Sequence, residues 1–214
     1  MHSLLKDGAA ALGVDLDNKM IEQYFEYMAF LKEYNQKVNL TRITEDREVI
    51  IKHFLDSLTL SKFIPLNARL VDIGTGAGFP GLALKIARPD ISPVLLDGTN
   101  KRVTFLKELM ERIGVTAEAI HGRAEELNKS PSMNKSFDIA TCRAVASLSK
   151  LIPYALPFLR VKGELLSQKS VNYHQELEEA AGVLKKYRAK VEDIVHVTLP
   201  ESDIEHCIIR IAVT

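Results

Sequence analysis

The residues best suited to do chemistry lie in the stretch VDIGTGAGFPG, from Val71 to Gly81, which holds four glycines directly behind a short apolar run. Glycine loses more conformational freedom on folding than any other residue, so such a cluster indicates unusual backbone dihedrals or a ligand close to the main chain. Gly74, Gly76 and Gly78 would make this tight turn. A pyrophosphate-binding GxGxxG motif would end in glycine where this sequence has Phe79. The loop therefore predicts a small-molecule site that is not a typical dinucleotide site.

A second candidate residue is Asp97, which comes 19 residues after Gly78 and ends the apolar run SPVLLD. A carboxylate in this place can accept hydrogen bonds from both ribose hydroxyls of an adenosine. The glycine loop and Asp97 together suit either NAD or S-adenosylmethionine.

The elements that must position these residues alternate along the chain. We expect strands at 69–73, 92–97, 117–121, 137–142 and 163–168, and helices at 81–88, 101–113, 124–127, 148–159 and 173–189. Such alternation predicts an α/β fold with a doubly wound parallel sheet, whose carboxyl edge carries the glycine loop. Two further strands, 191–199 and 205–213, are separated only by a turn and must therefore be antiparallel.

The first part of the chain predicts helices only. Apolar residues recur at a helical period from Asn18 to Val38, and a second helix has Thr44 as its N-cap and an apolar face from Ile50 to Leu58. We expect a helical extension over residues 1–64, followed by an α/β domain over residues 65–214.

Composition narrows the class of protein. The chain has 214 residues, of which 46% are hydrophobic and 26% charged, as in soluble globular proteins. No apolar run approaches the roughly 18 residues of a membrane span, and Asp7 interrupts any signal peptide, so we expect a cytoplasmic protein. Cys142 and Cys207 lie far apart and predict free thiols, and no metal-binding spacing is present, so we expect no metal.

The net charge of zero hides an uneven distribution. Residues 61–170 carry 16 basic and 10 acidic side chains, whereas residues 1–60 and 171–214 each have a net charge of −3. A basic middle segment is compatible with a nucleic-acid partner.

The antiparallel hairpin at the end of the chain favours one cofactor over the other. A parallel sheet that ends in such a hairpin resembles the class I S-adenosylmethionine-dependent methyltransferase (Rossmann-like) fold, here with seven mostly parallel strands and a helical N-terminal extension. An NAD-dependent oxidoreductase would need a substrate domain, for which no residues are left. A methyltransferase acting on a small molecule or a protein, and a non-catalytic RNA-binding protein, stay open as alternatives.

Six blocks resemble the signature motifs of the RsmG/GidB family. They are NLTRI (39–43), HFLDSL (53–58), DIGTGAGFPG (72–81), LLDGTNKRVTFL (95–106), GRAEE (122–126) and CRAVASL (142–148). The likeness extends from about Tyr24 to Val213. It implies a methyltransferase that modifies N7 of a guanine in small-subunit (16S) rRNA. The chain departs from the family pattern at Tyr34, Gly98 and Ser170, where tryptophan, serine and glycine are usual.

The resemblance also implies a set of site residues. The cofactor would be bound by Asp72, Gly74, Gly76, Gly78, Phe79, Asp97, Ala124, Glu125 and Arg143. Guanine N7 carries its own lone pair, so we expect no catalytic base, and the catalytic task of Arg143 would be to align the substrate.

Arg143 has a second interpretation, in which it only pairs with Asp138 or Glu125 to hold its loop. Similarly, His53 and Asp56 are expected to tie the N-terminal helices to the sheet rather than to touch the substrate.

Four basic residues follow expected strands and could contact phosphates of the RNA: Lys101, Arg102, Arg123 and Lys169. Arg160 and Lys162, expected just before the fifth strand, would lie at the other edge of the sheet. Because the protein is neutral overall, we expect its partner to be 16S rRNA within the small ribosomal subunit or an assembly intermediate, bound by a monomer.

Overall fold

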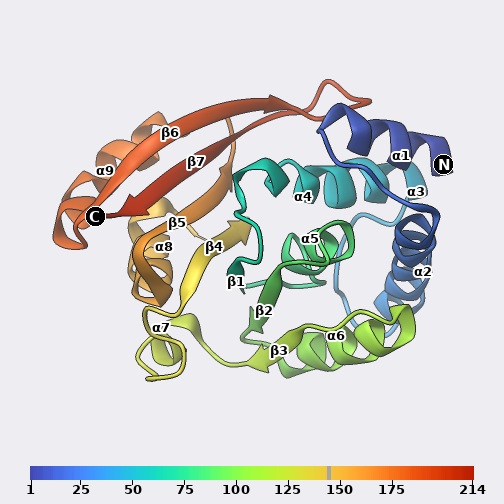
Figure 1. Ribbon diagram of the computed structural model, residues 1–214, viewed down its shortest axis with the longest axis horizontal. Helices are drawn as coiled ribbons and strands as arrows, with labels where there is room; N and C mark the ends of the chain where they lie inside the picture. The colour runs from blue at the N-terminus through green and yellow to red at the C-terminus, as the bar shows by residue number, and fades with distance from the viewer. Residues whose placement is uncertain (144–145) are drawn as a thin grey trace.

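The computed structural model describes residues 1–143 and 146–214, whose strands form one seven-stranded sheet in the order β3-β2-β1-β4-β5-β7-β6 (Figure 1). The first five strands pair in parallel, whereas β7 is antiparallel to both β5 and β6. This arrangement confirms the predicted fold class. The strands are β1 (Arg69–Ile73), β2 (Ser92–Asp97), β3 (Glu118–His121), β4 (Phe137–Arg143), β5 (Leu159–Lys169), β6 (Ala189–Thr198) and β7 (Glu205–Val213).

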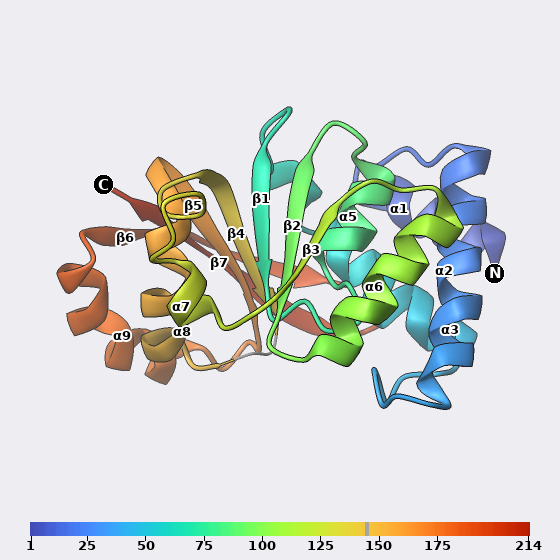
Figure 2. The ribbon, with the colours of Figure 1, turned by 90° about the horizontal axis from the view of Figure 1, so that it is seen from below.

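Helices cover both faces of the sheet (Figure 2). One face carries α5 (Gly81–Ala87) and α6 (Asn100–Ile113). Helix α2 (Asn18–Asn35) packs against both of them, and α1 (His2–Ala11) packs against α2. The other face carries α7 (Ala124–Leu127), α8 (Leu148–Ala155) and α9 (His174–Lys186). No helix in the described part of the chain is long and apolar enough to cross a membrane.

A broken helix joins the N-terminal helices to the sheet. It consists of α3 (Asp46–Val49), the π-helical segment η1 (Ile50–Leu55) and α4 (Asp56–Leu58), and the 3-10 turn η2 (Ser61–Phe63) follows. The helix begins at Asp46 with Glu45 in the cap position, so the prediction of Thr44 as its N-cap was wrong. Glu45 has extended backbone dihedrals, as an N-cap requires, but makes no side-chain capping bond.

The N-terminal helices and the sheet share one hydrophobic core. The buried residues Leu5, Tyr24 and Phe54 belong to the same cluster as Leu70 of β1 and Ile208 of β7. The predicted boundary at residue 64 thus marks a change from helices to alternating elements along the sequence, but the two parts pack together.

The start of β5 differs from the prediction. The helix expected to reach Leu159 ends at Ala155, because residues Leu156–Phe158 form the 3-10 turn η3 around Pro157. The strand begins at Leu159, four residues earlier than expected, and its pairing with β4 shifts register between Phe137 and Ile139. Arg160 and Lys162 therefore lie within β5 and not before it.

Candidate active site at the carboxyl edge of the sheet

The glycine loop between β1 and α5 is held by the carboxylate of Asp72 beneath it. Thr75 Oγ1 and the Gly81 amide donate to Asp72 Oδ2 at 2.6 and 2.8 Å, and Thr141 Oγ1 of β4 donates to Oδ1 at 3.2 Å. Asp72 is fully buried, and this burial raises its pKa from 3.8 to about 6. The Asp72 carboxylate therefore accepts hydrogen bonds from the protein itself and holds the glycine loop in its conformation.

The loop needs glycine because its backbone turns into the left-handed region. Gly74, Gly76 and Gly78 have φ values of 67°, 60° and 97°. A Cβ at Gly78 would also lie 2.5 Å from the hydroxyl oxygen of Tyr27. Both the dihedrals and the close packing exclude a larger side chain at Gly78.

Asp97, at the end of β2, ties the loop to the next strand. Its Oδ2 accepts a hydrogen bond from the Gly76 amide at 2.9 Å, and its Oδ1 accepts one from the Thr99 amide at 2.8 Å. Beside this strand end lies a cavity of about 280 Å³, whose lining includes Gly74, Gly98, Ala124 and Glu125. Three of these residues lining the first cavity, Gly74, Ala124 and Glu125, were predicted to contact the cofactor.

A second cavity, of about 460 Å³, lies where β4, β5 and β7 meet the broken helix. It is lined by Asp56, Arg143, Ala146, Gln168, Lys169, Ser170, Glu176 and His206. Asp56 is the link between these elements, because its carboxylate contacts side chains from all three strands. Arg143 donates to Oδ2 at 2.8 Å, and Gln168 donates to Oδ1 at 3.1 Å.

Arg143 is anchored to the N-terminal helices. Besides Asp56, it donates to the Lys52 carbonyl at 2.8 Å and lies 3.0 Å from Nδ1 of His53. Its guanidinium also lies 5.3 Å from the centre of the Phe79 ring. The predicted alternative pairing with Asp138 or Glu125 was wrong, because these carboxylates pair with Arg160 and Arg123.

His53 is neutral and connects Arg143 to the glycine loop. Its ring stacks on Phe79 at 4.4 Å, and its Nε2 lies 2.9 Å from Thr41 Oγ1. Burial first, and the charge of Arg143 second, lower its pKa from 6.5 to about 3. Its Nδ1 lies between the Arg143 guanidinium, which only donates, and the Lys52 carbonyl oxygen at 3.1 Å, which only accepts. The π-helical turn that carries His53 is typical of functional sites.

Comparison with known proteins identifies the family. The family model GidB, described as rRNA small subunit methyltransferase G, matches residues 20–205. The chain belongs to this family. A curated member from Thermoanaerobacter sp. strain X514 is 42% identical, over 97% of this chain and 88% of the relative. Another from Acetivibrio thermocellus is 43% identical, over 99% and 88%. Both are named ribosomal RNA small subunit methyltransferase G.

Solved structures agree with this family in fold. The structure of M. jannaschii TYW2 in complex with AdoMet has a TM-score of 0.61 and 13% identity, covering 81% of this chain and 80% of that chain. The B. subtilis M1A22 tRNA methyltransferase TrmK has a TM-score of 0.57 and 18% identity, covering 75% and 65%. The chain therefore has the fold of S-adenosylmethionine-dependent methyltransferases.

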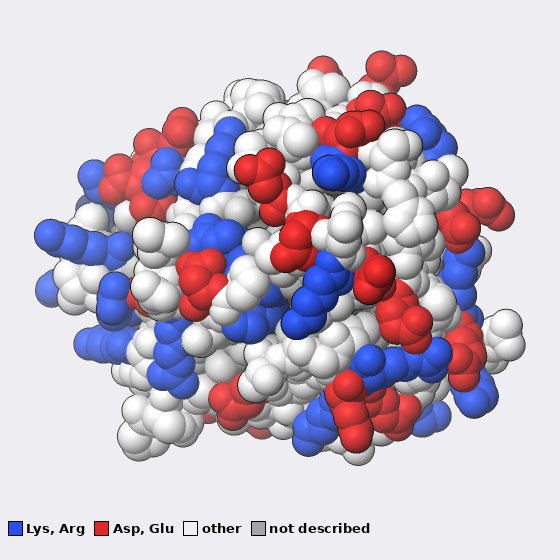
Figure 3. Space-filling model, turned by 45° about the vertical axis from the view of Figure 1, so that its right-hand side comes forward, with Lys and Arg blue, Asp and Glu red and all other residues white. Residues whose placement is uncertain are grey.

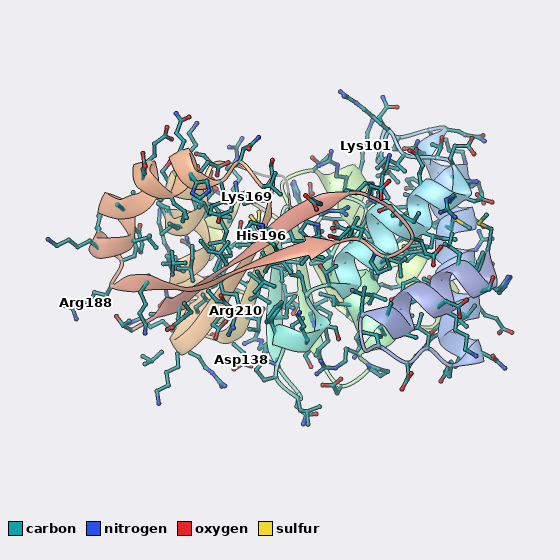
Figure 4. All side chains as sticks on the ribbon, turned by 90° about the horizontal axis from the view of Figure 1, so that it is seen from above. Lys101, Asp138, Lys169, Arg188, His196 and Arg210 are labelled. Atoms are coloured by element: carbon teal, nitrogen blue, oxygen red, sulfur yellow. The ribbon has the colours of Figure 1, made fainter. Side chains whose placement is uncertain are left out.

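The basic residues predicted for this family member to contact RNA lie at the expected edge, but most have acidic partners. Figure 4 shows Lys101 and Lys169 toward one side of the sheet and Asp138 toward the other. Arg102 contacts Asp97 at 3.4 Å, and Lys169 contacts Glu176 at 2.7 Å. Arg123 contacts Glu125 at 3.7 Å, whereas Lys101 is exposed.

Two residues of the second cavity, Gln168 and His206, were not predicted from the sequence. A signal was available, because Gln168 is the last residue of the expected strand 163–168 and so falls at the edge of the sheet that carries the glycine loop. His206 comes at the start of an antiparallel strand, and the start of such a strand lies at the edge where its parallel neighbours end.

Proposed function

We propose that this protein transfers a methyl group from S-adenosylmethionine to N7 of a specific guanine in 16S rRNA. Family membership carries this proposal, since the matched region contains the glycine loop, the first cavity and every lining residue of the second cavity except His206. The fold supports the cofactor, and the resemblance of the motifs supports guanine N7 as the target atom.

The first cavity would take the adenosine part of the cofactor. Asp97 would accept from the ribose hydroxyls, as carboxylates at this place in such folds do. Ala124 and Glu125 would lie against the adenine, and Gly74, Gly76, Gly78 and Phe79 would shape the space for the amino-acid end. Asp72 would act from below by holding the loop.

The reaction asks the protein mainly for alignment. The bound cofactor supplies an electrophilic methyl group on a sulfonium, and the N7 lone pair of guanine attacks it, so no proton has to be removed first. The C–S bond breaks as the N–C bond forms, and the positive charge passes to the base. Holding the reacting atoms at about 3–3.5 Å in line supplies much of the rate enhancement.

Arg143 would align the base without repelling the sulfonium. Its own charge is compensated by Asp56 at 2.8 Å, which reduces repulsion from the positively charged cofactor. Three of its N–H groups are used by Asp56, Lys52 and His53. Because guanidinium has five N–H groups, two are left to donate to the substrate.

The substrate would be folded RNA in a ribosomal particle. On the face shown in Figure 3, basic and acidic side chains are interspersed. The basic residues at the site are mostly paired with acids, which weakens their attraction for phosphate. We infer that the small subunit or an assembly intermediate, in the cytoplasm, supplies further contacts to a monomeric enzyme.

The test is to incubate the protein with methyl-labelled S-adenosylmethionine and small subunits that lack rRNA base methylation, and then to map the label. We expect label at one guanine N7, lost in Asp97→Ala and Arg143→Ala but retained in the control Lys107→Ala, on the exposed side of α6. Label on a metabolite or a protein instead would overturn the assignment of rRNA as the substrate. Equal rates on naked rRNA and on subunits at matched salt would overturn the particle as the preferred form.

A further inference from the structure

Two buried polar atoms in the second cavity have no hydrogen-bond partner among the described residues. They are Oε1 of Gln168 and Nε2 of His206. Both residues line the 460 Å³ cavity together with Arg143. Buried polar groups in native proteins are almost always paired, so two unpaired atoms in one cavity call for an explanation.

The strand register places these residues on one face of the sheet. Arg143 of β4 lies opposite Gln168 of β5, and Gln168 lies opposite Ile208 of β7. His206 is two residues from Ile208, so its side chain is on the same face. Three neighbouring strands therefore present Arg143, Gln168 and His206 toward α4 and its residue Asp56.

The orientation of the Gln168 amide is fixed by its partners. Its Nε2 lies 2.9 Å from the carbonyl oxygen of Asp56 and 3.1 Å from Asp56 Oδ1. Both of these atoms can only accept, so Nε2 must be the NH2 group and Oε1 must be the free atom. With a residue exposure of only 6%, the amide has little room to turn. Gln168 thus offers the cavity a fixed acceptor.

His206 offers a second acceptor. Its Nδ1 lies 3.4 Å from Asp56 Oδ1. Burial lowers the pKa of His206 more than Asp56 raises it, so the ring is neutral at pH 7. A neutral ring with its proton on Nδ1, facing the carboxylate, leaves Nε2 as an acceptor.

The cavity therefore presents donors from Arg143 and acceptors from Gln168 and His206. The Watson–Crick edge of guanine carries the complementary groups, namely the O6 acceptor, the N1–H donor and the 2-amino donor. Adenine and cytosine each carry one amino donor and no N–H beside it, and uracil carries a single N–H between two carbonyls. Guanine is thus the base with two adjacent donors.

We propose that Gln168 and His206 bind the N1–H and 2-amino groups of the target guanine and so select guanine over other bases. This inference rests on the proposed function. Enzymes that modify a base commonly read its Watson–Crick edge once the base has left the stack. Contacts on that edge leave N7, on the other edge, free to attack the methyl group.

The test compares three small subunits, reconstituted with guanosine, inosine or 2-aminopurine at the target position. Inosine lacks the 2-amino group, and 2-aminopurine keeps it but lacks N1–H and O6. We expect the wild-type protein to disfavour each analogue by about 10- to 100-fold in kcat/KM, the effect of leaving a buried acceptor unpaired.

The variants Gln168→Leu and His206→Leu distinguish a role in selecting guanine from a role in folding. Each should lose discrimination against one analogue by about tenfold and keep it against the other. A merely structural role would lower kcat/KM for all three substrates by the same factor. The ratios do not depend on the folded fraction, because the substrates share one enzyme preparation. Gln175→Leu, on the exposed side of α9, is the matched control and should keep both ratios.

The outcomes distinguish the two proposals. If wild-type protein transfers no methyl group to subunits with guanosine, the proposed function fails. If it methylates guanosine but accepts inosine and 2-aminopurine equally well, the function stands and this inference is overturned. The inference is also overturned if neither leucine variant changes a ratio.

Discussion

Replacing Asp56 with alanine perturbs the second cavity at the group on which its geometry depends. The Asp56–Arg143 ion pair is 2.8 Å long, with side chains that are only 12% and 19% exposed. At an effective dielectric constant of about 20, Coulomb's law gives an attraction of about 6 kcal/mol, which desolvation of both ions partly offsets. Removing one partner of such a buried pair costs about 3–5 kcal/mol. We expect Asp56→Ala to lower the free energy of unfolding by this amount.

Most of that cost would come from leaving the charge of Arg143 buried without a counterion. Adding Arg143→Met to Asp56→Ala removes this charge and keeps an unbranched apolar side chain. We therefore expect the double variant to be more stable than Asp56→Ala alone by about 1–2 kcal/mol. Urea denaturation of the parent, both single variants and the double variant gives the coupling energy directly.

Measuring cofactor binding distinguishes a loss of the second cavity from a loss of the folded structure as a whole. The double variant lacks both charges, and the first cavity is lined by neither residue. Its affinity for S-adenosylmethionine in the folded fraction should therefore stay within about twofold, while its kcat/KM for rRNA falls by at least about 100-fold. The reasoning is refuted if the double variant is no more stable than Asp56→Ala, or if the cofactor and rRNA affinities fall together.

Three further predictions concern the cofactor site and the pH dependence of stability. Asp97→Ala should weaken S-adenosylmethionine binding by about 100-fold in calorimetry, since it removes a charged acceptor for two hydroxyls, and unchanged affinity would contradict the ribose assignment. Gly78→Ala should lower the free energy of unfolding by at least about 2 kcal/mol, because of its φ of +97° and the contact with Tyr27, whereas Gly98→Ala, with nothing within 4 Å, should be neutral in the same urea titration. Because the pKa of His53 is lowered from 6.5 to about 3 in the folded chain, the unfolded chain binds more protons between pH 3 and 6.5. The contribution of His53 to stability is therefore lost as the pH falls through this window, by at most about 1.4 kcal/mol per pH unit. Asp72, whose pKa is raised to about 6, makes the free energy of unfolding change with pH in the opposite direction between pH 4 and 6. The informative quantity is therefore the difference in the free energy of unfolding between the wild type and His53→Gln. A difference that does not depend on pH would contradict a neutral buried His53.

The sequence predicted those features that depend on local pattern. Strands and helices alternate with clear punctuation from Arg69 onward, so the parallel sheet and the glycine loop could be inferred from the chain alone. The start of β5 could not, because Leu156, Phe158 and Leu159 continue a helical apolar spacing. The early start of the strand is seen only in its pairing with β4, where Leu159 lies opposite Phe137.

The sequence also did not predict which residues far apart along the chain contact each other. Asp56 and Arg143 are 87 residues apart, and nothing in local spacing indicates that they form an ion pair. The role of the N-terminal helices was expected only in general terms, as a tie to the sheet. That this tie also forms a wall of the second cavity depends on tertiary packing, which pattern analysis does not reach.

The position of β7 has a consequence for how the protein is made. This strand follows β6 in the chain but lies between β5 and β6 in the sheet. During synthesis, β5 therefore keeps an unpaired edge, and β6 has no neighbour, until Glu205–Val213 leaves the exit tunnel. Exposed edges of this kind invite pairing with other chains. Because His206 is on the same strand, closure of this edge and completion of the second cavity are one event, and the nascent chain has no complete second cavity before its sheet has closed.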